Sequence, residues 1–361
     1  MTPPTPKTRE DRALGALMGA YIGDALALGP HWYYDLDEMR SRYGDWIDGY
    51  TAPHDDHYHA GLAAGDGSQA AHLLTLMVES LIACDGYDEA DFCRRLDVDF
   101  FPLLDGEPMG GPGGYTSQSI RECWRARVQQ NRPWGACAGA ADTTEAIERC
   151  IALAIRYAGD PGAIARHVSA NTILTQDDQT VVALTIAYCE VLGLLVEGAA
   201  LDGAISGKLM ALCKSGELPF HTVTSGEAMG APASDRPEAT RAGRFASPDA
   251  LLTPSCIARA ATDPAVAIEP AWKVSLVYGM PCAIYHQLPA AYYLAARFDD
   301  GFEAAVLHAV NGGGQNQARA MLTGALAGAR AGLSGIPRRF VDGLNQGPSL
   351  LALGKRLIAD G

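Results

Sequence analysis

The chain has 361 residues, of which 48% are hydrophobic, so it can bury a substantial core as one large or two ordinary domains, and extensive disorder is excluded. Acidic residues outnumber basic residues by 42 to 28, which gives a formal net charge of −14. This balance argues against a nucleic-acid-binding surface and against an anionic membrane as a partner.

The beginning of the chain has no apolar signal core, and the longest apolar run, from Val181 to Cys189, ends at Glu190, too short to cross a bilayer. Nine cysteines occur without a C-x-x-C pair, and an odd number suits a reducing compartment. We therefore expect a cytoplasmic protein that neither enters a membrane nor depends on disulfides.

The first predicted helix runs from Arg12 to Leu28, after a flexible segment of residues 1–11. Gly15, Gly19 and Gly23 recur at every fourth position of this helix. Each glycine in a helix interior costs about 1 kcal/mol relative to alanine, so the repeat indicates a compensating close contact with a neighbour. Asp24 follows directly after this glycine row.

An aromatic cluster with one imidazole follows the proline that ends this helix, at His31-Trp32-Tyr33-Tyr34. It forms either one wall of a ligand cleft or a buried aromatic corner. Further on, His54, Asp55, Asp56, His57 and His59 superficially resemble a metal cluster. Their spacing matches no known ligand pattern, so we interpret this segment as a solvated loop.

The first polar turn, Gly65 to Gln69, precedes a strongly apolar helix that ends near Gly86. Asp66 and Ser68 are both good N-cap residues, so helix capping by itself accounts for one of them. A loop rich in glycine and proline, from Gly106 to Gly114, then leads to Tyr115 and offers backbone amides and hydroxyls to a ligand. It lacks the lysine and the spacing of a phosphate-binding P-loop.

Asp142 and Glu145 form a capping-box-like start to the next helix, which ends at Gly159. A second polar turn, Asn171 to Gln179, precedes an apolar helix from Val181 to Val196. Carboxylates at a helix N-terminus are stabilised by the helix dipole whatever else they do. Residues 215–255 are irregular in pattern, which is typical of a lid or an insertion.

The third polar turn lies between two helices near the end of the chain. An apolar helix ends at Asn311, Gly312-Gly313-Gly314 turn the chain, and Gln315, Asn316 and Gln317 begin the next helix. The glycines permit positive φ and close backbone approach, and amides at a helix N-terminus suit an oxygen-rich ligand.

A second glycine row, Gly324, Gly328 and Gly332, follows on that last helix. The two rows either pack against each other, which would bring Asp24 and His31 close to the glycine turn, or each row meets some other helix.

No segment alternates as a half-buried strand does, so the sequence predicts an all-α protein. The polar turns at 66–68, 176–178 and 315–317, together with Asp24, could converge at one end of the helices to form a site. We find no internal repeat and no domain boundary. We therefore expect a single domain over residues 12–345, followed by a C-terminal tail of residues 346–361.

These motifs carry a family resemblance. Residues 12–345 resemble the ADP-ribosylglycohydrolase superfamily through IGDALALGPHWYYD, GDGSQ, TQDD, AVNGGG and GALAGARAGLSGIP, in this order. Within the superfamily the chain looks most like the branch of the lens J-crystallins and a related selenoprotein. The resemblance implies a compact, orthogonal multi-helix bundle.

In the hydrolytic members, the resemblance implies two magnesium ions held by a Thr-Asp-Asp-Thr turn and a later Asp-Thr-Asp-Thr turn, which orient ADP-ribose and water. The matching residues here are Gly65-Asp66-Gly67-Ser68 and Gln315-Asn316-Gln317-Ala318, and Thr175-Gln176 stands where Thr-His is usual. Magnesium is bound mainly through carboxylates and water. We therefore expect no cofactor, or at most a single weakly bound magnesium ion.

The sequence thus predicts a hydrolase that cleaves an N- or O-glycosyl bond, or a related amide or C–N bond, of a small polar molecule such as a ribosyl compound. Such cleavage needs a carboxylate to activate water and an acid to assist the leaving group. The catalytic candidates are Asp66, Asp177, Asp24 and His31, with Asp66 or Asp177 as the base and His31 as a group that titrates near neutral pH. The candidates for substrate binding are Ser68, Gln69, Tyr115, Gln176, Asp178, Asn311, Gln315, Asn316, Gln317 and Arg319.

Two other functions stay open. The first is a catalytically silent ligand-binding or structural protein, as a crystallin-like use would imply. The second is the ordinary magnesium-dependent ADP-ribosyl hydrolase, which the missing carboxylates disfavour. A homo-oligomer is compatible with all three functions.

Overall fold

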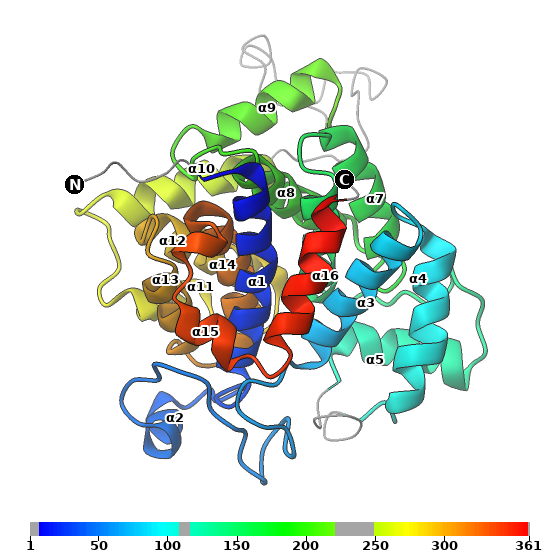
Figure 1. Cartoon of the computed structure of the whole chain (residues 1–361), viewed down its shortest axis with the longest axis horizontal. Helices are drawn as coiled ribbons and strands as arrows, with labels where there is room; N and C mark the ends of the chain where they lie inside the picture. The colour runs from blue at the N-terminus through cyan, green and yellow to red at the C-terminus, as the bar shows by residue number, and fades with distance from the viewer. Residues whose placement is uncertain (1–6, 108–115, 221–248, 360–361) are drawn as a thin grey trace, which may run out of the picture.

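Two helices with glycine at every fourth residue lie in direct backbone contact at the centre of the computed structural model (Figure 1). They are α1 (Arg9–Ala27) and α14 (Asn316–Ala331). A Cβ atom added to Gly19 would overlap the carbonyl oxygen of Gly324, and one added to Gly15 would overlap that of Gly328. Of the two alternatives that the sequence left open, the structure shows the first: the two glycine rows pack against each other.

The same contact fixes the position of Asp24. A Cβ atom on Gly23 would overlap the carbonyl oxygen of Ala320, in the first turns of α14. Asp24 is the next residue, so the close approach places its carboxylate beside Gln317, at the beginning of the partner helix.

The structure describes residues 7–107, 116–220 and 249–359, and in these ranges it has sixteen α-helices, two isolated β-bridges and no strand. The prediction of an all-α fold is confirmed. In Figure 1 the central helix α1 is flanked by α16 and α3 on one side and by α11 to α14 on the other. The remaining helices are α2 (Leu36–Tyr43), α3 (Gln69–Ala83), α4 (Glu89–Arg95), α5 (Gln118–Trp124), α6 (Glu145–Arg156), α7 (Pro161–Thr172), α8 (Gln179–Val196), α9 (Ile205–Ser215), α10 (Asp249–Thr262), α11 (Val274–Tyr278), α12 (Ile284–Arg297), α13 (Phe302–Val310), α15 (Arg338–Gly343) and α16 (Gly347–Ala359).

The expected boundaries differ from those observed at both ends of the domain. Helix α1 begins at Arg9 because Thr8 caps it, with the Thr8 hydroxyl accepting from the Asp11 N–H at 3.0 Å. The residues expected to form a C-terminal tail form helix α16, which packs on α1 and α3 and buries Leu357. The apolar stripe of α16 packs against helices that are distant in the chain, so the sequence did not indicate that these residues belong to the domain.

Helix α10 begins at Asp249, inside the stretch 215–255 that was expected to be irregular. Residues 221–248 of that stretch lie outside the described residues.

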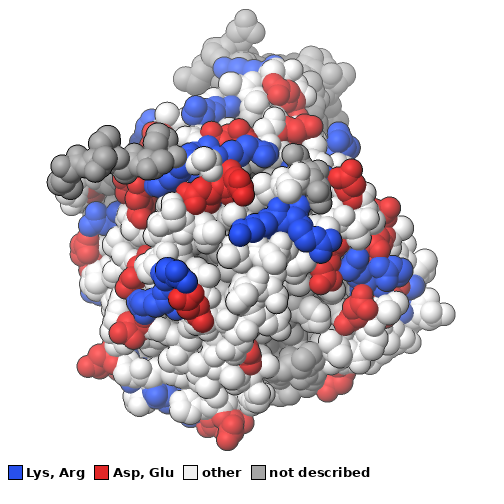
Figure 2. Space-filling view, viewed as in Figure 1, with Lys and Arg blue, Asp and Glu red and all other residues white. Residues whose placement is uncertain are grey.

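Helix α8, Gln179–Val196, is long and apolar enough to cross a membrane, and 72% of it is buried inside the structure. A core helix meets the same criteria of length and composition. Figure 2 shows basic side chains next to acidic ones on the viewed face, consistent with ion pairs such as Arg9–Glu197 at 2.5 Å and Arg339–Glu303 at 2.7 Å.

Replacing Gly19 by alanine should lower the free energy of unfolding by about 3 kcal/mol, because the new methyl group meets backbone that cannot move aside. Chemical denaturation measures this loss. Gly207→Ala in α9 is the control: its Cβ would meet nothing within 4 Å, so it should raise stability by about 0.5 kcal/mol through helix propensity. Equal effects of the two substitutions would contradict the close packing of α1 and α14.

Candidate functional site

The amino-terminal ends of several long helices meet on one side of the α1–α14 pair. The Ala146 N–H, at the start of α6, donates to Gln176 Oε1 at 3.0 Å, and Gln176 lies just before α8. The Ile284 N–H, at the start of α12, donates to the Asp142 carbonyl ahead of α6 at 2.7 Å. These bonds tie the N-termini of α6, α8 and α12 together.

Helix α14 joins the same group through the residue before it. The Gln315 N–H donates to the Met280 carbonyl at 2.9 Å, in the loop that leads to α12. Because the N-terminus of each helix carries partial positive charge, their meeting point favours acidic groups and ligand oxygens.

Asp24 connects the first polar turn to the third. Its carboxylate accepts from the Ser68 N–H at 2.7 Å, from the Ser68 hydroxyl at 2.6 Å and from Gln317 Nε2 at 2.7 Å. Asp24 is fully buried. Burial raises its pKa from 3.8 to about 6, although the three hydrogen bonds oppose that rise. Ser68 also caps α3 by accepting from the Ala70 N–H at 3.0 Å.

His31 contacts Gln315 on the other side of this network. Its Nε2 lies 3.1 Å from Gln315 Oε1, which also accepts from Trp32 Nε1. His31 Nδ1 lies 2.6 Å from His59 Nε2, and both imidazoles are fully buried. Since Gln315 Oε1 is an acceptor, the proton belongs on His31 Nε2, and Nδ1 accepts from His59.

This environment keeps His31 neutral. Desolvation lowers the pKa of His31 to about 3 and that of His59 well below its ordinary value. The prediction that His31 titrates near neutral pH is wrong, because burial between Gln315 and His59 disfavours the imidazolium.

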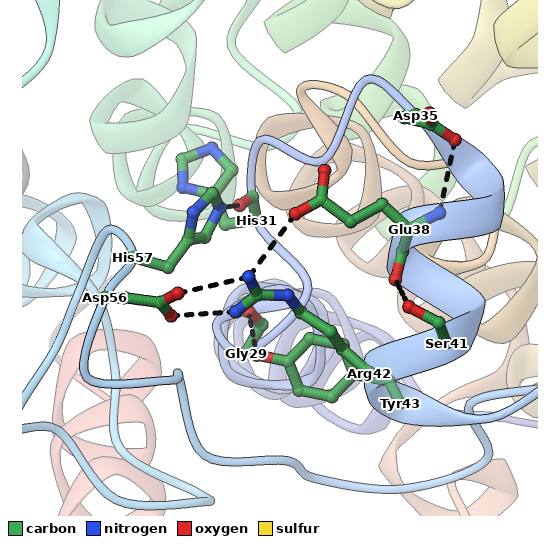
Figure 3. Close-up of polar contacts among 9 residues, drawn as sticks. All are labelled: Gly29, His31, Asp35, Glu38, Ser41, Arg42, Tyr43, Asp56 and His57. Carbon is green, nitrogen blue, oxygen red and sulfur yellow. Dashed lines mark hydrogen bonds and ion pairs between the residues drawn. The ribbon is translucent and has the colours of Figure 1, made fainter.

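The loop that carries His57 and His59 is not solvated as a whole. His57 Nε2 donates to the His31 carbonyl at 2.7 Å, and Asp56 forms an ion pair with Arg42 at 2.7 Å (Figure 3). The loop therefore covers His31, with Asp55 and Asp56 exposed, His57 half-buried and His59 fully buried. Three histidines within six residues were the available signal, and the burial of His59 was the part that the sequence did not show.

Three predicted substrate contacts instead hold the glycine turn. Arg319 Nε and Nη2 donate to the carbonyls of Ala309 and Gly313 at 3.0 and 2.5 Å. Asn316 Nδ2 donates to the Pro30 carbonyl at 3.0 Å. Asn311 exchanges two 2.8 Å hydrogen bonds with the Ile47 backbone. All three side chains are buried, and these bonds fix the backbone of the turn.

The second polar turn is divided between the interior and the surface. Gln176 Nε2 donates to the carbonyls of Ala141 and Thr143 at 2.9 Å, so this amide positions the loop before α6. Asp178 caps α8 by accepting from two backbone N–H groups at 2.8 and 2.9 Å. Asp177 is exposed.

Asp66 lies beside Ser68 but has other partners. Its carboxylate accepts from the Ala63 N–H at 2.7 Å and from Asn345 Nδ2 at 2.6 Å. It lines a cavity of about 390 Å³ that also borders α3 and the loop before α16. Of the other predicted contacts, Gln69 is buried at the start of α3, and Tyr115 lies outside the described residues.

Sequence reasoning did not identify Glu145 and Glu148 as candidates for the site, and both are buried on α6. Asp142 and Glu145 were expected to form a capping-box-like start to this helix, but Thr144 is the N-cap residue and makes no side-chain capping bond. Glu145 and Glu148 are 6% and 2% exposed, one helical turn apart on α6. The i, i+3 spacing was the available signal, because it puts both carboxylates on one helix face.

Residues 5–361 match the family model of ADP-ribosylglycohydrolase. The chain belongs to the ADP-ribosylglycohydrolase family. A solved structure titled "ADP-ribosylglycohydrolase-related protein complex" is similar over 98% of this chain and 99% of that chain, with a TM-score of 0.61 and 17% sequence identity. Identity at this level shows the fold alone. No curated protein matches the sequence significantly.

In this member of the family, neutral amides stand at positions where the resemblance implies carboxylate ligands for two magnesium ions. Asp24 already accepts three hydrogen bonds, and Gln317 directs its nitrogen, which cannot bind a metal ion, toward that carboxylate. Within residues 7–107, 116–220 and 249–359, no group of three or more His, Cys, Asp or Glu side chains could hold a metal ion.

Replacing Asp24 by asparagine should lower the free energy of unfolding by about 2 kcal/mol at pH 4.5, because the asparagine NH₂ group cannot accept a hydrogen bond from Ser68 or Gln317, whereas both oxygens of the Asp24 carboxyl group can. The loss should be smaller at pH 7. The wild-type carboxyl has a raised pKa, so its contribution to stability falls as pH rises from about 4 to about 6, whereas asparagine does not titrate. Urea unfolding at both pH values measures the difference.

Asp178→Asn is the matched control, since asparagine caps a helix about as well as aspartate, and its stability should change by less than about 0.5 kcal/mol. A loss for Asp24→Asn that is equal at pH 4.5 and pH 7 would contradict the raised pKa.

Proposed function

We propose that this protein is a hydrolase that cleaves an N- or O-glycosyl bond, or a related amide or C–N bond, of a small polar molecule without tightly bound magnesium. Membership of the ADP-ribosylglycohydrolase family supports a hydrolase. The observation that carries the proposal is the Asp24 network, in which a serine and a glutamine bind the carboxylate directly.

Hydrogen-bond donors take over part of the role of a cation in this proposal. The Ser68 hydroxyl and the Gln317 amide stabilise the Asp24 carboxylate, and the N-termini of α3 and α14 add partial positive charge. Neutral amides and hydroxyls bind the hydroxyl and carbonyl groups of a sugar, which need no metal to orient them. A ribosyl compound has this chemistry.

The reaction requires the addition of water across one bond. Water attacks the anomeric carbon, the bond from that carbon to nitrogen or oxygen breaks, and the departing atom receives a proton. Asp24 is a positioning residue in this scheme, because its oxygens hold Ser68 and Gln317. The proton transfers therefore belong to other carboxylates at the meeting point of the helices.

The alternative is a ligand-binding or structural protein without catalysis, of the kind that the J-crystallin resemblance suggests. One observation favours it: Arg319, Asn316, Asn311 and Gln176 all bind backbone groups, so much of the polar cluster maintains the fold. The buried carboxylates favour the enzyme, because burying acids without a cation lowers stability, and acids with raised pKa values are concentrated at functional sites.

A thermal-shift screen tests the proposal with ADP-ribose, nicotinamide nucleotides, nucleosides and small amides, each with magnesium and with chelator. The proposal expects at least one of these compounds to raise the melting temperature equally in both conditions and to be hydrolysed with chelator present. A compound that binds but is never hydrolysed would support the alternative. Stabilisation by ADP-ribose only with magnesium would overturn the metal-independent mechanism.

The double variant Gln315→Asp/Gln317→Asp is the positive control for metal binding. A carboxylate at position 317 would stand close to Asp24, and the two substitutions together supply the anionic oxygens that magnesium prefers. Its melting temperature should rise with magnesium and fall with chelator, whereas the wild type should respond to neither. A wild type that responds as the variant does would contradict the proposal.

A further inference from the structure

A small polar void lies between α3, α5 and α6, next to the Asp24 network. Glu145, Glu148, Gln69 and Ser117 line it, and its other walls are apolar. Its volume of about 10 Å³ is close to the room that one water molecule requires. Gln69 follows Ser68 directly, and the Ser68 hydroxyl donates to Asp24, so the void adjoins the Asp24 network.

Hydroxyl groups fix the orientation of both carboxylates. Glu145 accepts from the Ser119 hydroxyl at 2.8 Å and from the Thr143 hydroxyl, and Glu148 accepts from the Thr144 hydroxyl at 2.7 Å. Such bonds hold a carboxylate in one rotamer but leave its charge uncompensated.

Arg149, the next residue on α6, directs its guanidinium elsewhere. Its Nε donates to Asn171 Oδ1 at 2.7 Å, and its Nη2 donates to Thr175 Oγ1 at 2.9 Å. Its bond to Glu145 goes to the backbone carbonyl, at 3.3 Å. The two carboxylates therefore face the void without a salt bridge to this arginine.

Ser117 supplies an independent indication that the void binds something. The residue is only 5% exposed, and its Oγ has no hydrogen-bond partner among residues 7–107, 116–220 and 249–359. A buried hydroxyl without a partner is unfavourable, and one that lines a water-sized void is satisfied when a water molecule binds there.

We propose that this void holds the hydrolytic water molecule, that Glu145 and Glu148 are the base and acid of the reaction, and that Ser117 orients the water. This inference rests on the proposed function. One carboxylate takes a proton from the water while the water oxygen forms a bond to the anomeric carbon. The other carboxyl is protonated and gives its proton to the nitrogen or oxygen that departs as its bond to the anomeric carbon breaks. A proton then moves from the first carboxyl to the second, which restores the starting state of the pair.

The electrostatics of the pair are consistent with one shared proton. Desolvation and, after it, the charge of Glu145 raise the pKa of Glu148 to about 8. Desolvation also raises the pKa of Glu145. Among the other groups near the pair, Asp24 opposes ionisation of Glu148, Arg149 favours ionisation of both, and the Cys282 thiol is itself affected by both charges. Two buried carboxylates on one helix face do not both ionise readily at neutral pH.

Glu145→Gln and Glu148→Gln should each lower kcat by about 100-fold or more and leave KM within about threefold, as loss of a general acid or base does. Each variant should also lose one limb of the pH–rate profile. Ser117→Ala should lower kcat by roughly tenfold, the effect of one hydrogen bond.

Glu190→Gln is the matched control. Glu190 is a buried carboxyl of α8 whose pKa burial also raises well above its ordinary value, but its charged neighbours are Asp160 and Glu217, away from the void. This variant should keep the wild-type kcat and pH profile. Wild-type kcat in both Glu145→Gln and Glu148→Gln would overturn the inference and leave the proposed function intact.

Infrared spectroscopy tests the shared proton without a substrate. At pH 7 the wild type should show protonated-carboxyl absorption, of which Glu148→Gln removes one part and Glu190→Gln removes a separate part. Raising the pH above 9 should remove the part that Glu148→Gln removes. A spectrum unchanged in both Glu145→Gln and Glu148→Gln would overturn the inference independently of turnover. A wild type that hydrolyses no tested compound would overturn the proposed function, and with it the catalytic role of the pair.

Discussion

The backbone contact between α1 and α14 is the constraint on which the rest of this structure depends. Glycines on both helices let the two backbones meet without side chains between them, so the registration of one helix against the other is set by carbonyl oxygens and Cα atoms. The contact extends to Gly23, and Asp24 thereby reaches Gln317 from a position nearly 300 residues away in the chain. A looser pairing of these helices would separate the first polar turn from the third.

The site built on this pair is unusual in its balance of charges. Buried carboxylates at Asp24, Glu145 and Glu148 are stabilised by hydroxyls, amides and helix N-termini rather than by a close cation. Such groups keep protons at a pH where exposed carboxyls lose them, which suits proton transfer better than metal coordination. The neutral histidine pair His31–His59 supports Gln315 in the same way, through hydrogen bonds and without charge.

Much of the polar chemistry near the site maintains the backbone. Arg319, Asn316 and Asn311 together hold the glycine turn, and Gln176 holds the loop ahead of α6. Loops without regular structure leave backbone groups unpaired, and buried side-chain amides satisfy them. Polar residues beside a cleft can either hold the backbone in place or bind a ligand, and only their hydrogen-bond partners show which of these they do.

Local patterns in the sequence determined the helices, the glycine rows, the polar turns and the family, because helical periodicity, capping residues and motif order are encoded by residues close together in the chain. The local sequence did not show whether the Glu145 side chain would cap α6 or be buried, because both outcomes share the same pattern. The packing of α6 against α3 and the hydrogen bond from Ser119 of α5 decide that it is buried. The burial of His59 and the docking of α16 were likewise decided by partners far along the chain. Tertiary structure alone determined which polar groups were buried, because desolvation depends on every element that packs around a group.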